Sequence, residues 1–237
     1  MQILPLERLA LSFAPRPWDF AQARRAEIDA YFATLRRDKP ALWNGRTLLM
    51  HEARIAGTTL EGEFLETDFA SFIAWRDWGF PDLSIRSCFA HGALRAADGA
   101  YLLGVMGTQT ANAGRVYFPG GSPDPADIVD GAVDFEVNVR REVAEETGLT
   151  ESDYEVRPGW HAAVFGQRIA LSKILQAHAP AEELRARIRA HIARDAAPEL
   201  ADIRIVRGPA DVTADILPFT VAFLMRMWRE GQPAGEG

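Results

Sequence analysis

The segment 135–148, FEVNVRREVAEETG, constrains the fold more than any other stretch of the chain. Its apolar residues Phe135, Val139 and Val143 recur every four positions. This spacing predicts an amphipathic helix that packs one face onto a sheet. Gly148 stands where a left-handed residue commonly ends a helix. A chain with such a helix needs a sheet for it to cover, which favours an α/β fold.

A second face of the same predicted helix is acidic. Glu142, Glu145 and Glu146 stand at i, i+3 and i+4, so their carboxylates project from one side of the helix. Like charges at that spacing destabilise a helix by roughly 0.2–0.5 kcal/mol, and more so near its negative C-terminal end. Compensation comes either from Arg141 together with solvent, or from a divalent cation such as Mg²⁺ or Mn²⁺, which prefers carboxylate oxygens.

The full string resembles the signature of the Nudix hydrolases, R-E-U-x-E-E-x-G-U with U apolar. The match runs over residues 141–149, REVAEETGL, and FPGG at 118–121 resembles the family's usual approach to the signature. The resemblance covers only 118–149. It implies an α/β/α sandwich with a mixed sheet, and an enzyme that hydrolyses a nucleoside diphosphate linked to another group by attack of water at phosphorus.

The resemblance also implies roles for individual residues. Glu142 and Glu146 would hold a Mg²⁺ or Mn²⁺ ion, with Glu145 assisting and the backbone carbonyl of Gly120 as a further ligand. Arg141 belongs to the same catalytic group. The general base in the family is either a signature glutamate or an acid on a distal loop. Glu199 is the distal candidate, and its alternative interpretation is a solvated loop acid.

The spacing departs from the family pattern G-x5-E-x7-R-E. Arg141 follows Gly121 by 20 residues, which implies six inserted residues within SPDPADIVDGAVDF. Counting back eight residues from Arg141 reaches Val133, where the family usually has a glutamate that holds the arginine. Asp130 and Asp134 are the candidates to replace that contact.

Three basic residues outside the signature are candidates to clamp substrate phosphates. Arg115 precedes FPGG, and Arg168 and Lys173 lie on a later predicted strand. Arginine forks bind phosphate in a bidentate manner, although an ordinary surface charge is the alternative for each residue. His91 and His161 lie in strand-like runs, and we expect them in the core or at its rim rather than as ligands.

Composition limits the partners of the chain. The net charge of −7 and the pI near 5.3 disfavour nucleic acid or an anionic membrane as a partner. Cys88 is the one cysteine and lies in an apolar run, so we expect a buried thiol in a reducing compartment. The N-terminal MQILPLERLALSF has no long apolar run, so neither a signal peptide nor a membrane span is expected. The expectation is a soluble cytoplasmic protein.

The remaining pattern predicts two units. Residues 1–83 form an N-terminal α+β subdomain with a helix over 18–37, strands over 46–55 and 59–65, and a helix over 68–78 capped by Thr67. Residues 84–230 form the Nudix-like domain, with strands and helices alternating around the signature. Its predicted strands cover 85–94, 100–107, 115–118, 154–165, 168–178 and 201–206, and its predicted helices cover 181–195 and 217–228. Residues 231–237, GQPAGEG, are predicted to form a disordered tail.

Aromatic residues of the predicted N-terminal subdomain admit two interpretations. LWNGR and LETDFASFIAWRDWG are faintly similar to the Nudix branch that cleaves UDP-sugars. We nevertheless expect Trp43, Trp75 and Trp78 in the core, since large aromatic residues are usually buried.

Three functional hypotheses follow from these residues. The first is a metal-dependent pyrophosphohydrolase of a nucleoside diphosphate derivative, such as a nucleotide sugar or coenzyme A. The second is a catalytically impaired Nudix-like module that binds nucleotides or regulates a partner, and Val133 is its one sequence argument. The third is a scaffold protein whose acidic helix face is merely solvated. The resemblance also implies a homodimer, since members of the family often dimerise.

Overall fold

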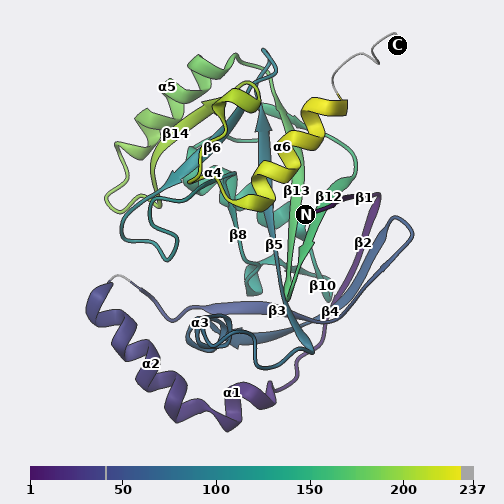
Figure 1. Cartoon of the computed structure of the whole chain (residues 1–237), viewed down its shortest axis with the longest axis vertical. Coiled ribbons are helices and arrows are strands. Elements are labelled where there is room, and N and C mark those ends of the chain that lie inside the picture. The colour runs from purple at the N-terminus through teal and green to yellow at the C-terminus, as the bar shows by residue number, and fades with distance from the viewer. Residues whose placement is uncertain (41, 231–237) are drawn as a thin grey trace.

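The computed structural model of the chain describes residues 1–40 and 42–230 (Figure 1). In this part of the chain, fourteen strands join into one sheet. Parallel pairing of β13 (Arg168–Ala177) with β5 (Ile85–Arg95) beside antiparallel pairing of β12 (Trp160–Phe165) with β13 makes the sheet mixed, as predicted. Its larger half consists of β1 (Ile3–Leu6), β5 (Ile85–Arg95), β6 (Tyr101–Met106), β7 (Val116–Tyr117), β8 (Gly120–Gly121), β11 (Tyr154–Val156), β12 (Trp160–Phe165), β13 (Arg168–Ala177) and β14 (Leu200–Val206).

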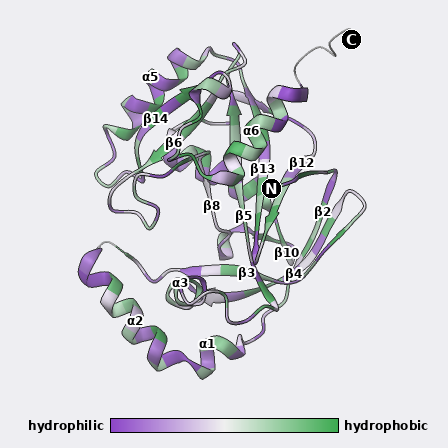
Figure 2. Cartoon of the chain, viewed as in Figure 1, coloured by the Kyte–Doolittle hydropathy of each residue, from purple (hydrophilic) through white to green (hydrophobic). Residues whose placement is uncertain are grey.

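Helices cover both faces of this larger half. They are α4 (Phe135–Thr147), α5 (Ala181–Ile192) and α6 (Pro218–Glu230). Because side chains alternate across a strand, Leu171 of β13 joins the buried cluster under Val143 of α4, whereas the adjacent Ala170 joins the cluster under Phe223 of α6. Apolar colouring is concentrated in the central strands between these helices (Figure 2). The result is the expected α/β/α sandwich.

The N-terminal part forms the second half of the sheet, covered by its own helices. Its strands are β2 (Arg8–Phe13), β3 (Arg46–Ala56) and β4 (Thr59–Asp68), and its helices are α1 (Asp19–Ala23), α2 (Arg25–Asp38) and α3 (Phe69–Asp77). A separate small core, which includes Trp18, Leu49, Leu65 and Trp75, lies between α3 and the strands. Figure 1 shows this unit below the sandwich, with α2 on its outside.

The segment inserted before the signature helix ties the two halves together. After the short 3₁₀ helix η1 (Pro125–Asp127), it forms the hairpin of β9 (Ile128–Val129) and β10 (Ala132–Val133). Asp130 and Gly131 turn the hairpin in the left-handed region, at φ 50° and 78°. Ala132 then pairs with Ser12 of β2, so the insertion extends the sheet of the N-terminal unit.

Strand pairing crosses the boundary expected near residue 83. β1 pairs antiparallel with β12, and β3 pairs with β5 at Met50 and Arg86. The division into 1–83 and 84–230 stays a prediction about folding units. The expected tail at 231–237 lies outside the described residues.

Three predicted element boundaries were wrong. Thr67 stays in β4, paired with Thr47, and the cap of α3 is Asp68, whose Oδ1 accepts a hydrogen bond from Ser71 N at 2.7 Å. The helix expected over 18–37 is interrupted at Arg24, where the backbone leaves the helical region. The strand expected over 154–165 is divided into β11 and β12, with Gly159 in the left-handed region between them.

Predictions about buried residues had mixed outcomes. Cys88 is buried as expected, and burial raises the pKa of its thiol. Trp75 is fully buried and Trp78 is half-buried, but Trp43 is 65% exposed, so the expectation of a core residue was wrong there. Trp43 precedes β3 and lines a cavity between the two halves of the molecule. Among the described residues, no helix is both long and apolar enough to cross a membrane.

Candidate active site

The signature helix α4 is held at both ends, which sets the direction of its acidic edge. Asp134 caps the N-terminus, and its Oδ1 accepts hydrogen bonds from the backbone N–H groups of Glu136 and Val137 at 2.8 and 3.2 Å. Gly148 ends the helix at φ 70°, as predicted. The predicted apolar stripe is buried against the sheet. The glutamates of the signature therefore project from the edge of the sandwich.

Two glycines bring the backbone of β8 close to that edge. Gly120 has φ 149°, and a Cβ there would lie 2.2 Å from the carbonyl oxygen of Ala90, so only glycine fits. Its N–H donates to Glu146 Oε1 at 3.1 Å. A Cβ at Gly121 would lie 2.7 Å from Glu142 Oε1. The FPGG turn is therefore packed directly against two signature carboxylates.

Glu146 is the most deeply buried acid of the edge. Its residue is 7% exposed, and its Oε2 has no hydrogen-bond partner among residues 1–40 and 42–230. Burial, followed by repulsion from Glu142, raises the pKa of Glu146 well above its ordinary value. A buried carboxylate oxygen without a partner is costly, which makes this position one that a cation stabilises.

Glu142 and Glu145 differ in exposure. The Glu142 side chain is 14% exposed, and burial raises its pKa to about 7, while Arg141 opposes the shift. Arg141 Nη1 lies 3.0 Å from Glu142 Oε1 and 3.6 Å from Glu145 Oε2. The Glu145 side chain is 62% exposed, so it faces solvent beside the two buried acids.

The acid that holds Arg141 is Asp127, not Asp130 or Asp134, so that hypothesis was wrong. Arg141 Nη2 donates to Asp127 Oδ2 at 2.9 Å and to Oδ1 at 3.2 Å, and Nε donates to Oδ1 at 3.3 Å. Asp134 is occupied as the helix cap, and Asp130 lies in the hairpin turn. Asp127 also accepts from Asn138 Nδ2 at 2.9 Å and is completely buried.

A distal loop brings Glu199 to the same place. It precedes β14, and its carbonyl accepts from Gly107 N at 2.7 Å, which fixes the loop beside the β6–β7 connection. Glu199 lines a cavity of about 220 Å³ together with Glu142, Glu145 and Glu146. Partial burial, followed by repulsion from Glu145, raises the pKa of Glu199. The four acids predicted from sequence therefore surround one small space.

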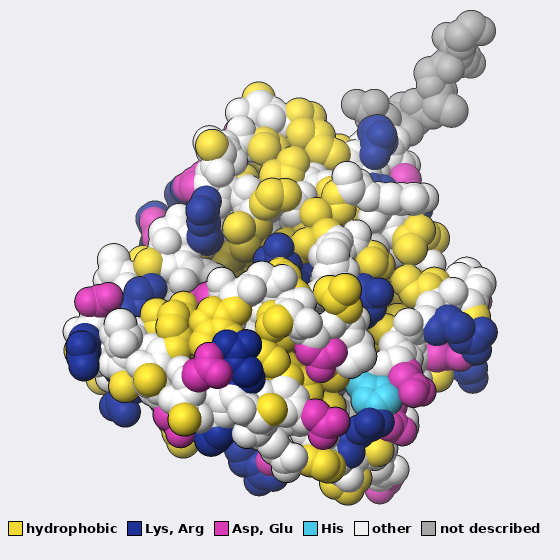
Figure 3. Space-filling view, turned by 60° about the horizontal axis from the view of Figure 1, so that its bottom comes forward, with side chains coloured by type: hydrophobic (Ala, Val, Ile, Leu, Met, Phe, Trp, Pro, Cys, Tyr) yellow, Lys and Arg dark blue, Asp and Glu magenta, His cyan; other side chains and the backbone are white. Residues whose placement is uncertain are grey.

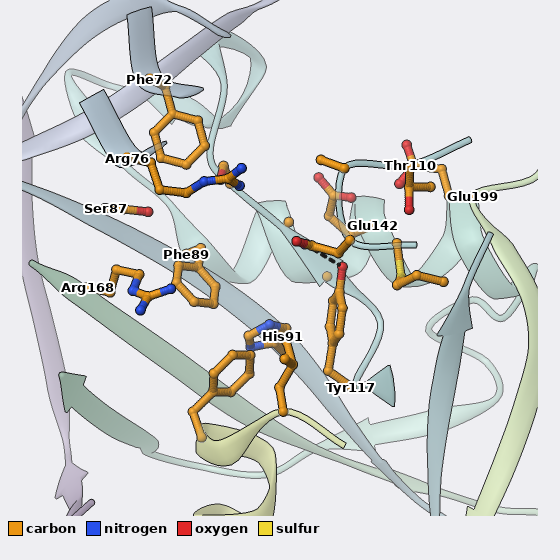
Figure 4. A pocket seen from close by; sticks show the side chains of 18 of the residues that line it. Phe72, Arg76, Ser87, Phe89, His91, Thr110, Tyr117, Glu142, Arg168 and Glu199 are labelled. Atoms are coloured by element: carbon orange, nitrogen blue, oxygen red, sulfur yellow. Dashed lines mark hydrogen bonds between the residues drawn. The ribbon is translucent and has the colours of Figure 1, made fainter. Parts of the chain in front are cut away.

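A larger cavity of about 850 Å³ adjoins the acidic one, and Glu142 and Glu199 line both. This volume suits a small organic ligand. Figure 4 shows the acids on one side of the larger cavity and aromatic and basic side chains on the other. Its walls come from both halves of the molecule, and the aromatic residues among them are Trp43, Phe69, Phe72, Phe89, His91, Tyr117, Phe165 and Phe219.

The three predicted phosphate clamps lie in different surroundings. Arg168 lines the large cavity. Lys173 is buried elsewhere, with its Nζ 2.6 Å from Glu136 Oε1 and 4.8 Å from the centre of the Trp160 ring. Arg115 is exposed and is not one of the cavity-lining residues. The fold brings only Arg168 of the three to the cavity.

Histidines 91 and 161 are packing residues in the described structure, as expected. His91 is buried in the cavity wall, where its ring stacks on Phe219 with a centroid distance of 5.1 Å. Burial lowers its pKa to about 4, so its ring is neutral at neutral pH. His161 is half-buried against Phe223.

The donor set fits a hard divalent cation. Over residues 1–40 and 42–230, no three His, Cys, Asp or Glu side chains form a metal-binding group by themselves. Mg²⁺ does not require one, because it commonly uses one or two carboxylates and completes its shell with water and substrate oxygens. The buried Glu146 with its unpartnered oxygen, beside Glu142, meets that requirement.

Comparison with known proteins gives matches only among solved structures. No family model and no curated protein matches the chain. A Nudix hydrolase from M. smegmatis, RenU, shares 21% identity over 64% of this chain and 91% of its own, with a TM-score of 0.41. A MutT protein from Methanosarcina mazei Go1 shares 21% identity over 62% and 96%, with a TM-score of 0.44.

A third match is longer than this chain. It is a bifunctional NMN adenylyltransferase/ADP ribose pyrophosphatase from Francisella tularensis, solved with AMP and a manganese ion. It shares 14% identity over 67% of this chain and 46% of its own, with a TM-score of 0.44. At these identities and TM-scores the matches show a likeness and assign neither a family nor a function to this chain.

The spacing pattern G-x5-E-x7-R-E also explains why Asp127 was missed. Counting six residues forward from Gly121, as in G-x5-E, reaches Asp127, whereas counting back from Arg141 reaches Val133. The six extra residues therefore lie after the acid, in the β9–β10 hairpin. Asp127 stands where the pattern has its glutamate, and a forward count would have made it a candidate beside Asp130 and Asp134.

Proposed function

We propose that the protein is a divalent-metal-dependent hydrolase that cleaves the phosphoanhydride bond of a nucleoside diphosphate linked to another group. The observation that carries the proposal is the convergence of Glu142, Glu145, Glu146 and Glu199 on one small space beside a cavity of about 850 Å³. The unpartnered Oε2 of Glu146 supports a cation at that space.

Glu142 and Glu146 would hold the ion, with Glu145 and the carbonyl of Gly120 as further ligands. A divalent cation bound there supplies positive charge to the phosphate oxygens and to the attacking water. The glycine turn holds the Gly120 backbone beside the helix, since its N–H donates to Glu146. Arg141 is a positioning residue, because its guanidinium joins Asp127 to Glu142 and so sets the direction of that carboxylate.

Glu199 is the proposed general base. Its raised pKa places its carboxylate nearer to the pH at which a base accepts protons efficiently. The water oxygen bonds to phosphorus, the anhydride bond to the leaving phosphate breaks, and the water proton passes to the Glu199 carboxylate. Arg168 in the cavity wall, and Arg115 from outside it, are proposed to attract the anionic substrate.

The proposed partner is a small nucleoside diphosphate derivative, with a nucleotide sugar or coenzyme A as examples. On the face shown in Figure 3, acidic and basic side chains alternate around hydrophobic ones. This pattern differs from the continuous basic track that binds nucleic acid. A cytoplasmic location and a homodimer remain proposals. The impaired binding module has lost its sequence argument, since Asp127 makes the contact that Val133 lacks.

Phosphate release tests the proposal. Wild type and Glu146→Gln are incubated with UDP-glucose, ADP-ribose, NADH, coenzyme A, diadenosine polyphosphates and nucleoside triphosphates, with Mg²⁺ or Mn²⁺ and a coupled phosphatase. We expect one substrate class to be cleaved by wild type and not by Glu146→Gln. Glu155→Gln, an exposed acid on β11, is the matched control and should retain activity. Silence of the wild type on every compound, despite thermal stabilisation by metal, would favour the binding module.

A further inference from the structure

The large cavity is electrically asymmetric. Glu142 and Glu199 line one side, and Arg76 and Arg168 line the other (Figure 4). Aromatic side chains such as Phe89 lie between these sides. A substrate whose diphosphate lies at the acidic side through a cation thus extends along an apolar wall towards two guanidinium groups.

Arg76 comes from α3 of the N-terminal unit. Its Nε donates to Asp77 Oδ1 at 2.8 Å, and its guanidinium points into the cavity in Figure 4. Asp77 Oδ2 accepts a hydrogen bond from Tyr31 of α2 at 2.9 Å, so that carboxylate is shared between Arg76 and α2. Among residues 1–40 and 42–230, the Nη groups of Arg76 bond to no acidic side chain, and they retain donors for a ligand.

Arg168 is the first residue of β13 and lies on the same side of the cavity as Arg76 (Figure 4). Within residues 1–40 and 42–230 it forms no ion pair with an acidic side chain. Its guanidinium instead lies 4.7 Å from the centre of the Phe165 ring and 5.6 Å from that of Phe80. Burial and then the charge of Arg76 lower the pKa of Arg168, so the two cations repel one another. An anion between them relieves that repulsion.

Strained backbone holds one of these aromatic contacts. Phe80 has φ 62°, a region that bulky residues rarely occupy. Its N–H donates to Trp75 O at 2.9 Å, and its ring packs on Trp75 with centroids 4.8 Å apart. The segment that follows α3 is thus fixed in an unfavourable backbone conformation. This conformation holds the Phe80 ring against the Arg168 guanidinium.

We propose that Arg76 and Arg168 form a second anion subsite, which binds a phosphate or carboxylate of the substrate other than the diphosphate. Ser87, a buried residue on the same side of the cavity, adds a hydroxyl there. The inference rests on the proposed function. It narrows the substrate to a nucleotide derivative that carries a further anionic group, separated from the diphosphate by a planar or apolar portion.

The alternative use of the arginines is to grip the diphosphate itself. That arrangement predicts that removal of an arginine lowers the binding affinity equally for every diphosphate ligand. A second anion subsite predicts that affinity falls only for ligands that carry the extra anion. Matched ligand pairs therefore separate the two uses, and they also distinguish a phosphate from a carboxylate as the group recognised.

Calorimetric binding to a Glu142→Gln protein, in which turnover is blocked, provides the first test. The pairs are NADPH with NADH, coenzyme A with 3′-dephospho-coenzyme A, and UDP-glucuronate with UDP-glucose. In at least one pair we expect the anion-bearing ligand to bind about tenfold more tightly, as for one charge-assisted contact. Adding Arg168→Gln or Arg76→Gln to the Glu142→Gln protein should abolish that preference. The affinity for the ligand without the extra anion should stay nearly unchanged.

Arg54→Gln is the matched control, because Arg54 is exposed, pairs with Glu61 and does not line the cavity. It should retain the preference. Equal weakening of both ligands of every pair, or no preference in any pair, would overturn the subsite. Turnover of the same ligands by wild type is measured in parallel. If the anion-bearing ligands bind more tightly in an arginine-dependent way but no ligand is turned over, the hydrolase proposal alone is refuted. If ligands are turned over but the anion-bearing ones bind no more tightly, the subsite alone is refuted.

Discussion

Two buried acidic regions lie on neighbouring sides of α4 and differ in how their charge is balanced. Both oxygens of Asp127 accept hydrogen bonds from Arg141, and Asn138 donates to the same carboxylate. Glu146 accepts one bond from Gly120, and its other oxygen has no partner in the described chain. The first region is compensated by the protein itself, while in the second the described residues give Glu146 a single hydrogen bond and no counter-charge, and its pKa is raised.

The difference separates a structural role from a chemical one. A buried charge with good partners stabilises its surroundings only as long as the partner remains. A buried charge without partners costs stability, and such groups concentrate at functional sites. Substitutions in the two regions should therefore have opposite effects on stability and on turnover.

The largest expected effect is the loss of turnover in Glu146→Gln. Removal of the most buried proposed ligand should lower kcat by about 10³-fold, as for other groups that stabilise transition-state charge. In EDTA the variant should melt no lower than wild type, because an amide replaces a repelled carboxylate. Initial rates test the loss of turnover, and melting curves in EDTA test the stability. A Glu146→Gln variant that stays active but melts lower than wild type would contradict the difference between the two acidic regions.

Asp127→Asn should instead destabilise the protein. The amide removes the buried anion that contacts Arg141 through both oxygens, which we expect to cost about 2–4 kcal/mol of unfolding free energy after allowance for the partly exposed guanidinium and its remaining contact with Glu142. Urea unfolding measures the loss. At temperatures where the variant is folded, its kcat should fall less than that of Glu146→Gln. Unchanged stability would show that Asp127 does not anchor the helix.

The stability of the metal-free protein should depend on pH through Glu142. Its folded pKa of about 7 lies above the ordinary value of 4.5, so the neutral form is favoured in the folded state. Its contribution is therefore fully present below pH 4.5 and is lost as the pH rises through 7. The loss should be on the order of 2 kcal/mol. Urea unfolding in EDTA between pH 5 and 8 should show this slope in wild type and a smaller one in Glu142→Gln. Equal slopes would refute the assignment.

The smallest effect is expected for Asp134→Ala. Loss of the two backbone hydrogen bonds at the start of α4 should cost about 1 kcal/mol, typical of an N-cap. Turnover per folded molecule should not change, because Asp134 holds neither Arg141 nor the proposed ion. Chemical unfolding and kcat measured together distinguish it from Asp127→Asn. A large fall in kcat would show that Asp134 has a role in turnover beyond capping the helix.

The local sequence pattern predicted which helices and strands form better than it predicted the residues at which they begin and end. The apolar spacing of 135–148 and the glycine after it predicted α4 and its end, because both depend on residues within a few turns. Thr67 was predicted as a cap because it precedes a helical pattern. It lies in β4 because strand pairing with Thr47 continues past it, and a distant strand is not visible in local sequence.

The candidate site divides in the same way. The acids of the signature share one helix, so their spacing alone predicted that they would point together. Glu199 could be suggested only as a distal acid, and its approach depends on the loop before β14 and its bond to Gly107. Trp43 and Arg76 come from the N-terminal unit, and no spacing in the chain predicts that they line the same cavity.

The sequence by itself determined the acidic helix and the glycine turn, because each follows from spacings of a few residues, whereas the layers of the sandwich were expected from the resemblance carried by residues 118–149. Only the tertiary structure decided which acid holds Arg141, where the six inserted residues lie and what closes the cavity. Those outcomes depend on sheet pairing between segments far apart in the chain. Such pairing is set by burial and backbone hydrogen bonding across the whole sheet, which no short stretch of sequence contains.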